Sequence, residues 1–260
     1  MRRGDFFCLA AAGLSAAAEP LLGQDGANAE HHLVSLSFDD GFRKSFVRTA
    51  EIYEKFGLPA CFNVTAAGHR PEVGIKDDYV SPGQIGDFTL WNELAARGHE
   101  IMPHGYRHAH KDRLPFEEAT SLISGCLTVF ENELKGFRAS RAVFNFPYND
   151  TTPQISAWMR GRVLAWRCHG PMINPLPHRG LVEIGAGGFG PGNAEAHLDR
   201  QIKELLSRES GWLVYNLHGL DDEGWGPVGS AYLEKLLDRL VKIKSVKIVP
   251  TARALWEAGA

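Results

Sequence analysis

The chain has 260 residues, of which 44% are hydrophobic and 23% charged, and its formal net charge is −3. These values are ordinary for a globular protein and exclude a disordered, collagen-like or coiled-coil chain. The small negative charge gives no broad basic surface of the kind that binds nucleic acid or anionic membranes. The length allows one large domain, and an α/β barrel fits within it.

The first eighteen residues have the layout of a secretory leader. Arg2 and Arg3 give a positive start, residues 6–18 form an apolar run, and the alanines at 16–18 provide a small-residue cleavage pattern. The arginine pair also resembles a degenerate twin-arginine leader, and the alternative is a buried or frayed N-terminal helix. This interpretation divides the chain into a signal peptide, an N-terminal extension and a folded domain, at residues 1–18, 19–30 and 31–260.

Export would place the mature protein in the periplasm, on the cell surface or in the medium. No other segment is long and apolar enough for a membrane helix, so we expect no membrane span after leader removal. Cys61, Cys126 and Cys168 then remain, and an odd number leaves at least one free thiol. The apolar run around Cys61 and the helical pattern around Cys126 favour buried structural thiols.

From residue 31 onward, short β-rich runs alternate with segments of helical periodicity. Eight runs predict strands, at residues 33–38, 60–64, 100–102, 142–146, 163–167, 182–184, 212–217 and 247–249. Seven segments predict helices, at residues 42–56, 87–97, 115–135, 153–160, 194–209, 231–243 and 251–257. Residues 66–86 contain glycines and prolines that predict a long surface loop.

This alternation favours parallel strand pairing with right-handed crossovers. We therefore expect a single α/β domain, namely a (β/α) barrel of about seven strands, with an open doubly wound sheet as the alternative. No glycine-rich dinucleotide motif or phosphate-binding loop follows the first predicted strand, which argues against nucleotide binding.

Polar residues follow several of the predicted strands. Asp39 and Asp40 follow the first, His104 and His108 the third, and His218 the seventh. In a (β/α) barrel the carboxyl ends of the strands supply the reactive groups. Each residue alone has an ordinary explanation, such as a helix cap or an exposed loop position. Together they form one constellation that independent explanations account for poorly.

The spacing of these residues suits metal-assisted hydrolysis. His104 and His108 are four residues apart, so in a helical turn both imidazoles face the same side. Two histidines and one carboxylate can hold a divalent ion and leave positions open for water or substrate. The second carboxylate of the Asp39–Asp40 pair then suits a general base, and His218 a proton donor. Spacing alone does not say which aspartate has which role.

Four motifs occur in order along the chain: SFDDGF at residues 37–42, HGYRH at 104–108, FPY at 146–148 and LH at 217–218. Together they resemble the ordered motifs of polysaccharide deacetylases, the NodB-homology domain of carbohydrate esterase family 4. The resemblance spans about residues 33–255, and the first two motifs are specific when they occur together. It implies a distorted form of the (β/α) barrel.

The resemblance also implies roles for individual residues. Asp40, His104 and His108 would bind a divalent metal ion, zinc or another first-row ion such as cobalt or nickel. Asp39 would act as the general base. His218 would act as the general acid.

The implied reaction is attack of metal-bound water on the acetamide carbonyl of a sugar, releasing acetate and a free amine. The backbone N–H of Tyr148 would stabilise the oxyanion. The substrate would be an acetylated carbohydrate, an N-acetylated amino-sugar polymer or oligomer. Two alternatives stay open: an O-acetyl esterase of a glycan such as acetylxylan, and a carbohydrate-binding protein with a non-catalytic barrel. No nucleic-acid partner is expected.

One departure from the family pattern concerns the residue that orients the base. Many relatives have an arginine in the third motif, whereas Asn145 stands near that place here. Arg138 or Arg141 is a candidate substitute.

Two further departures concern the acid and the acetyl pocket. The fourth motif is reduced to Trp166 and has no nearby aspartate to orient His218, so Asp221 or Asp222 would do so from the following loop. Asn216 stands where many relatives have an apolar residue, which would alter the pocket for the acetyl methyl group.

The expected substrate contacts combine motif residues with the acidic loop after His218. Trp225 in that loop would stack on a sugar ring or pack the loop, and Trp166 would wall the acetyl pocket or lie in the core. His110 is expected to be exposed. The predicted substrate-binding residues are Trp166, Pro147, Tyr148, Leu217, Asp222 and Trp225.

Overall fold

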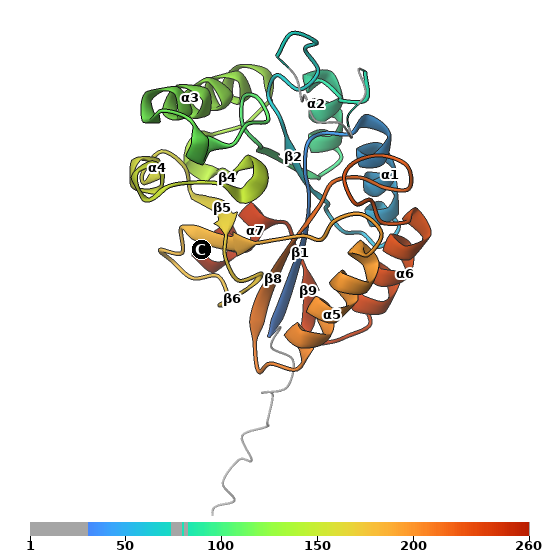
Figure 1. Ribbon diagram of the computed structural model, residues 1–260. Helices are drawn as coiled ribbons and strands as arrows, with labels where there is room; N and C mark the ends of the chain where they lie inside the picture. Colours follow the sequence, from blue (N-terminus) through green and yellow to red (C-terminus); the bar gives the residue numbers. More distant parts are fainter. Residues whose placement is uncertain (1–30, 74–79, 81–82, 260) are drawn as a thin grey trace, which may run out of the picture.

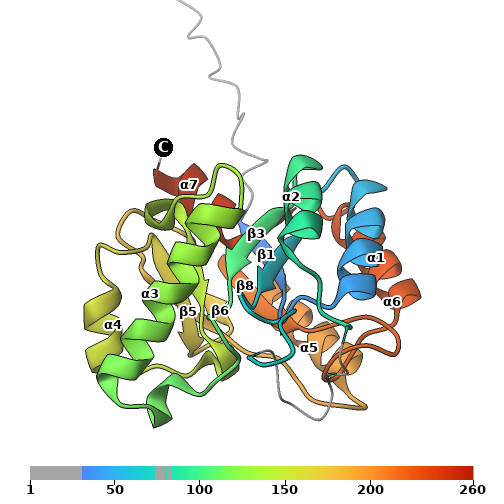
Figure 2. The same ribbon diagram turned by 90° about the horizontal axis from the view of Figure 1, so that it is seen from above.

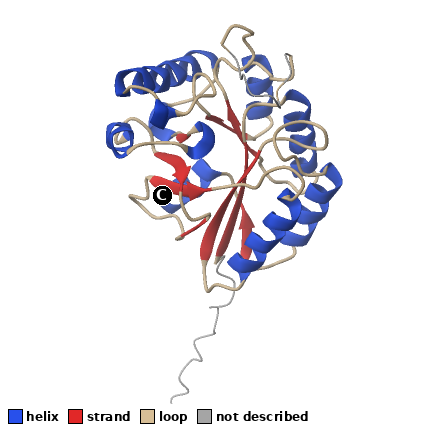
Figure 3. Cartoon of the chain, in the orientation of Figure 1, coloured by secondary structure: helices blue, strands red, loops and turns tan. Residues whose placement is uncertain are grey.

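The computed structural model describes residues 31–73, 80 and 83–259, and the expected leader and N-terminal extension lie outside them. Strands occupy the centre of the fold and helices surround them (Figures 1 and 3). The strands are β1 (His32–Phe38), β2 (Cys61–Val64), β3 (Glu100–Pro103), β4 (Val143–Asn145), β5 (Ala165–His169), β6 (Ile173–Asn174), β7 (Glu183–Ala186), β8 (Gly211–Leu217) and β9 (Val246–Ile248). The helices are α1 (Arg43–Glu54), α2 (Phe88–Ala96), α3 (Phe116–Glu133), α4 (Pro153–Met159), α5 (Ala194–Leu206), α6 (Ser230–Leu240) and α7 (Thr251–Gly259).

Each of the eight predicted strands and seven predicted helices has a counterpart in the structure. The helix expected over residues 42–56 is α1, which buries Phe46, Ala50 and Tyr53 on one face, as the periodicity indicates. It ends early because the chain turns at Gly57, where φ is +66° and a residue with a Cβ is disfavoured. The sequence pattern missed β6, a two-residue strand that pairs antiparallel with β8.

The strands form two sheets. The larger has the order β3-β2-β1-β8-β6, and the smaller has the order β4-β5-β7. β1 is central, because it pairs in parallel with β8 along its full length, from His32 to Phe38. Its other edge is shared: β9 pairs with residues 32–34 of β1 and β2 pairs with Ser37 and Phe38. Both sides of β1 are therefore covered.

The two sheets face a common interior, which makes the fold the expected distorted (β/α) barrel. Hydrogen bonds cross this interior: Arg167 on β5 donates to Ser37 on β1, and Asn145 on β4 donates to Asn63 on β2. A single bridge between Gly187 and Tyr215 joins the β7 side to β8. Among the residues that the structure describes, no ladder joins β3 to β4. Figure 2 shows α3 and α4 on the side of β5, and α1 and α6 on the opposite side.

Buried apolar residues fill the space between strands and helices. Phe46 of α1 stacks on Phe62 of β2, with ring centroids 4.5 Å apart. Cys61, Cys126 and Cys168 are buried and free. Burial was predicted for Cys61 and Cys126, and the odd cysteine count predicted at least one free thiol. Within the described part of the chain, no helix combines the length and hydrophobicity needed to cross a bilayer.

Candidate active site

A cavity of about 600 Å³ opens at the carboxyl ends of the central strands. Seven of the residues singled out from the sequence line it: Asp39, His104, His108, Tyr148, Asn216, His218 and Trp225. Asp39 follows β1, His104 follows β3 and His218 follows β8. The parallel strands thus bring together residues that are far apart in sequence, as the barrel argument predicts.

Asp40, His104 and His108 form a candidate metal site. Oδ1 of Asp40 lies 3.4 Å from Nε2 of His104 and 3.3 Å from Nε2 of His108. One ligand atom from each residue lies within 4.8 Å of the other two. Nδ1 of His104 lies 3.0 Å from the carbonyl oxygen of Asn145. Because a carbonyl only accepts, Nδ1 carries the proton and Nε2 keeps its lone pair for a cation.

The charges at this site also suit a divalent cation. Burial alone would raise the pKa of Asp40, but the neighbouring His108 and His104 hold it well below its usual range. Burial lowers the pKa of His104, which favours the neutral imidazole that binds metals. One ionised carboxylate and two imidazoles are the donor set of an open, catalytic type of site. These residues therefore fit the metal that their spacing predicts.

Backbone strain is concentrated around the cavity. Among the described residues, four non-glycine residues have positive φ: Asp40, Tyr148, Asn149 and Asp221. All four follow the carboxyl ends of β1, β4 or β8. Such conformations cost free energy for residues with a Cβ and gather at functional sites.

Asp39 is held by Arg167, a residue that the sequence interpretation did not assign to the site. Nη1 of Arg167 donates to Oδ1 of Asp39 at 2.8 Å, and Nη2 donates to Oδ2 at 2.5 Å. Asp39 is 2% exposed and Arg167 is fully buried. Burial alone would raise the pKa of Asp39, but the Arg167 guanidinium, with smaller effects of His104 and His218, lowers it. The carboxylate is therefore kept ionised.

A buried polar network extends this contact. Nδ2 of Asn63 donates to Ser37 and to Oδ1 of Asp39, at 2.6 and 2.8 Å. Nδ2 of Asn145 donates to Oδ1 of Asn63 at 2.8 Å. Asn145 stands near the expected place of the family arginine, and here it supports Asp39 indirectly through Asn63. Its carbonyl oxygen meanwhile orients His104, so one residue serves both halves of the site.

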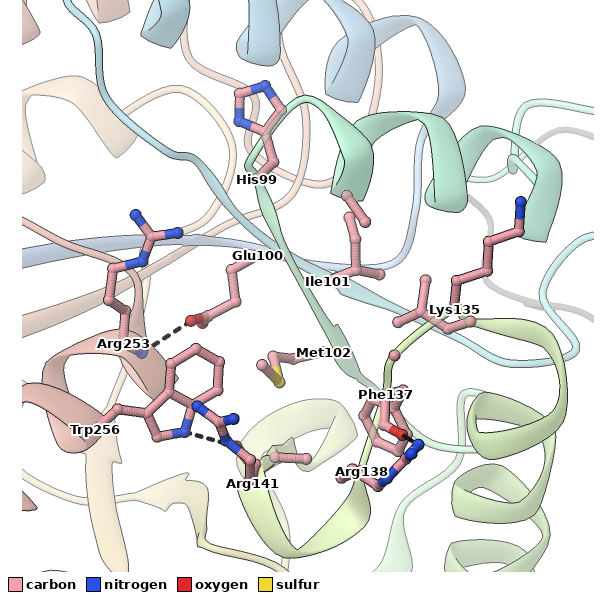
Figure 4. A pocket seen from close by; sticks show the side chains of 14 residues that line it. His99, Glu100, Ile101, Met102, Lys135, Phe137, Arg138, Arg141, Arg253 and Trp256 are labelled. Atoms are coloured by element: carbon pink, nitrogen blue, oxygen red, sulfur yellow. Dashed lines mark hydrogen bonds between the residues drawn. The ribbon is translucent and has the colours of Figure 1, made fainter.

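Arg138 and Arg141 do not substitute for the family arginine. Both lie at a second cavity of about 280 Å³ at the opposite, amino-terminal ends of β3 and β4 (Figure 4). Arg138 donates to the carbonyl oxygen of Phe137, and the guanidinium of Arg141 lies 4.6 Å from the centroid of the Trp256 ring. The sequence indicated Arg167 only as a charged residue within an otherwise apolar predicted strand.

The loop after β8 is anchored to α1 and to the start of α6. The carboxylate of Asp221, one expected partner of His218, accepts from the backbone N–H of Ser230 at the start of α6. Glu223 is 2% exposed, and its Oε2 accepts from the backbone N–H and the hydroxyl of Ser45, both at 2.8 Å. The ring of His218 meets the ring of Trp225 edge to face, with centroids 5.4 Å apart.

Tyr148 is fixed by a neighbouring histidine. The rings of Tyr148 and His110 are stacked, with centroids 3.6 Å apart and an interplanar angle of 7°. Nδ1 of His110 contacts Oδ2 of Asp150, whose Oδ1 lies 3.1 Å from Nε2 of His169. The expectation that His110 is exposed is wrong, because its side chain is 29% exposed and packs on Tyr148.

The predicted substrate contacts divide into two groups. Tyr148 and Trp225 line the cavity, whereas Pro147, Leu217, Asp222 and Trp166, all within the described residues, do not. Trp166 is fully buried, so the expectation that it walls the acetyl pocket is corrected. Successive side chains along a strand point to opposite faces, so only one of these two neighbours on β5 can face the interior. Arg167 faces it, and Trp166 points the other way.

Asn149 and Asn216 add polar groups to the cavity wall. Oδ1 of Asn149 accepts from Nε of Arg167 at 3.1 Å and from Nδ2 of Asn216 at 3.2 Å. Sequence reasoning missed Asn149, although it directly follows Tyr148. Asn216 lines the cavity, and its effect on the acetyl pocket stays a prediction.

A sequence model of the polysaccharide deacetylases matches residues 26–160, just over half of the chain. The chain belongs to the polysaccharide deacetylase family. The matched region contains Asp39, Asp40, His104, His108 and Tyr148, which confirms the resemblance seen in the motifs. As a member of this family, the protein is a hydrolase that acts on acetylated carbohydrates. No curated protein matches the chain significantly by sequence.

Solved structures with the same fold include deacetylases and an acetyl xylan esterase. A polysaccharide deacetylase homologue from Mycobacterium smegmatis has a TM-score of 0.61 and 14% identity, covering 94% of each chain. A family 4 acetyl xylan esterase from Clostridium thermocellum, solved with a cobalt ion, has a TM-score of 0.56 and 14% identity, covering 86% of this chain and 91% of its own. The catalytic domain of a peptidoglycan N-acetylglucosamine deacetylase from Eubacterium rectale has a TM-score of 0.53 and 17% identity, covering 85% and 89%. These similarities establish the α/β fold of this polysaccharide deacetylase.

Proposed function

We propose that this protein is a metal-dependent N-deacetylase of an N-acetylated amino-sugar polymer or oligomer. The observation that carries the proposal is the different surroundings of two neighbouring carboxylates. Asp40 lies against the imidazoles of His104 and His108, whereas Asp39 is held by the guanidinium of Arg167. These different surroundings support a cation-binding role for Asp40 and a proton-accepting role for Asp39.

Asp40, His104 and His108 would hold the cation, with zinc as the proposed ion and cobalt or nickel as alternatives. When bound, this ion supplies a Lewis acid that polarises the acyl carbonyl and lowers the pKa of water. The carbonyl oxygen of Asn145 fixes the ring of His104 and its tautomer before any cation arrives.

The other residues handle protons and negative charge. Asp39, kept ionised by Arg167, takes the proton of the attacking water. His218, at the end of β8, gives a proton to the departing sugar nitrogen. The backbone N–H of Tyr148 donates to the carbonyl oxygen as negative charge develops there. Because an amide nitrogen leaves poorly without a proton, loss of His218 should slow amide hydrolysis more than ester hydrolysis.

We also propose that the protein is exported, with residues 1–18 as its leader. The support is the order of basic, apolar and small residues at the start of the chain. Sequencing the amino terminus of the protein recovered from its native host tests this, and a start at Glu19 is expected. An intact Met1 on the fully accumulated protein would contradict it.

The proposed activity is tested by acetate release from a panel of N-acetylated and O-acetylated glycans. Each assay is run on the purified protein, after chelation, and after zinc is restored. We expect release from N-acetylated amino sugars that is lost on chelation and recovered with zinc. Release from acetylxylan alone would instead establish the O-acetyl esterase. Release that survives complete metal removal would refute the metal-dependent mechanism.

A further inference from the structure

Exposed aromatic side chains gather at the mouth of the active-site cavity. Phe189, Trp225 and Val241 are the large hydrophobic residues that the described part of the chain leaves exposed, at 41%, 38% and 45%. Trp225 lines the cavity, and Phe189 stacks on His197, which also lines it. Val241 lies apart, at the end of α6. Exposed apolar groups that border a cavity mark a binding surface more often than isolated ones do.

Two loops bring these aromatic rings together. Phe189 lies on the loop between β7 and α5, and Trp225 lies on the loop between β8 and α6. A Cβ added to Gly190 would lie 2.7 Å from Cζ2 of Trp225, so the indole packs directly on the backbone beside Phe189. Gly226 has a φ of +58°, and a Cβ there would lie 2.8 Å from the carbonyl oxygen of Phe189. Glycine at both positions allows the loops to touch.

The rings are held in place before any ligand arrives. The rings of Phe189 and His197 have centroids 4.7 Å apart and an interplanar angle of 21°. Nδ1 of His197 lies 2.9 Å from the hydroxyl of Tyr215, a fully buried residue of β8. Trp225 packs edge to face against His218. A surface fixed in this way loses little conformational freedom when it binds, which favours affinity.

We infer that Phe189, His197 and Trp225 form a stacking platform for a sugar residue next to the one that carries the acetyl group. Sugar rings have an apolar C–H face that packs on an aromatic ring while the hydroxyl groups stay in water, and the platform offers such rings at the rim of a polar cavity. These three residues would therefore contribute to the binding of the neighbouring sugar. This inference rests on the proposed function for the identity of the reacting group.

The test is the dependence of kcat/KM on chain length, measured with N-acetylglucosamine oligomers from one to six units. For the unaltered protein we expect kcat/KM to rise by about tenfold or more between one unit and four units. Phe189→Ala and Trp225→Ala should reduce this ratio to about threefold or less, since each removes one stacking contact. Val241→Ala is the matched control, because it removes an equally exposed hydrophobic side chain away from the cavity, and it should keep the full ratio.

Gly190→Ala gives a sharper version of the test, because it displaces the indole without removing it. We expect it to reduce the chain-length ratio as Trp225→Ala does. Calorimetric binding of glucosamine oligomers, the deacetylated products, measures the platform without turnover, and a tetramer should bind more tightly than a single glucosamine. An equal kcat/KM for all lengths, or a ratio unchanged in both Phe189→Ala and Trp225→Ala, would overturn the inference. If no substrate releases acetate, the proposed function fails, and the oligomer binding of the same variants still decides the platform.

Discussion

Replacing Arg167 by methionine should both destabilise the fold and disable Asp39. Arg167 donates four hydrogen bonds, two to Asp39 and one each to Ser37 and Asn149. Removing one partner of a buried ion pair leaves the other charge uncompensated, which typically costs about 3–5 kcal/mol. We expect the free energy of unfolding at pH 7 to fall by about this amount. Urea unfolding measures it.

The pH dependence gives the sign of the effect. In the unaltered protein the folded state holds the pKa of Asp39 below its usual range. The pair therefore stabilises the fold above the unfolded pKa of about 3.9, and this stabilisation is lost as the pH falls through the folded pKa. In Arg167→Met only burial and weaker neighbours remain, so the pKa of Asp39 should rise. The stability deficit of the variant should then grow as the pH rises above about 4.

Activity should follow the same logic. With a raised pKa, Asp39 is partly protonated, so the acidic limb of the kcat profile should move to higher pH, and kcat should fall by about 100-fold or more as the carboxylate loses its orientation. The double variant Asp39→Asn with Arg167→Met should recover much of the lost stability, because it removes both charges. Arg138→Met, at the other end of β4, is the control. A loss of stability below about 1 kcal/mol together with an unshifted acidic limb would refute the reasoning.

Three further outcomes are expected. Asp40→Asn should weaken zinc binding by more than the roughly 10–100-fold loss that is typical when an outer-shell partner is removed. Asp39→Asn should keep the metal and lose turnover. Zinc binding is measured by equilibrium dialysis, and equal metal loss in both variants would contradict this division. Burial lowers the pKa of Lys111 to about 8, so the folded state carries a penalty for the charged lysine that is present below that pH. The free energy of unfolding, compared with that of Lys111→Met, should therefore rise by up to about 3 kcal/mol between about pH 8 and 10. Urea unfolding at two pH values checks it, and a constant difference would be the contrary result. Glu223→Ala leaves the N–H and hydroxyl of Ser45 without their acceptor, so the free energy of unfolding should fall by about 1–3 kcal/mol in urea or thermal unfolding. The variant should also lower kcat, because the loop after His218 is less firmly held. Unaltered kcat would show that other contacts fix the loop.

The strand and helix pattern and the residues of the candidate metal site were predictable from the sequence because both depend on local signals. Phe46, Ala50 and Tyr53 repeat at helical spacing, and Asp40 and His104 stand directly after strands. Parallel strands end at one edge, so the position of such residues in the chain already predicts that they meet.

Arg167 was not predictable in the same way. It contacts Asp39 across the barrel, and nothing in the spacing of the two residues requires that contact. The family motif pointed to Trp166, which is fully buried. The next residue, Arg167, is the one that binds Asp39. A charged residue inside a buried strand is the local signal that points to such a partner.

The pairing of β1 has a consequence for when the candidate metal site forms. β1 carries Asp39 and Asp40 at its end, yet its neighbours β8 and β9 come from the last fifty residues of the chain. Contacts between such distant segments close large loops, and proteins that depend on them fold slowly. A chain that is folded only as far as His108 thus holds Asp40, His104 and His108 but lacks the strand that fixes the end of β1. The candidate metal site is therefore completed only at the final stage of folding, once β8 has paired with β1.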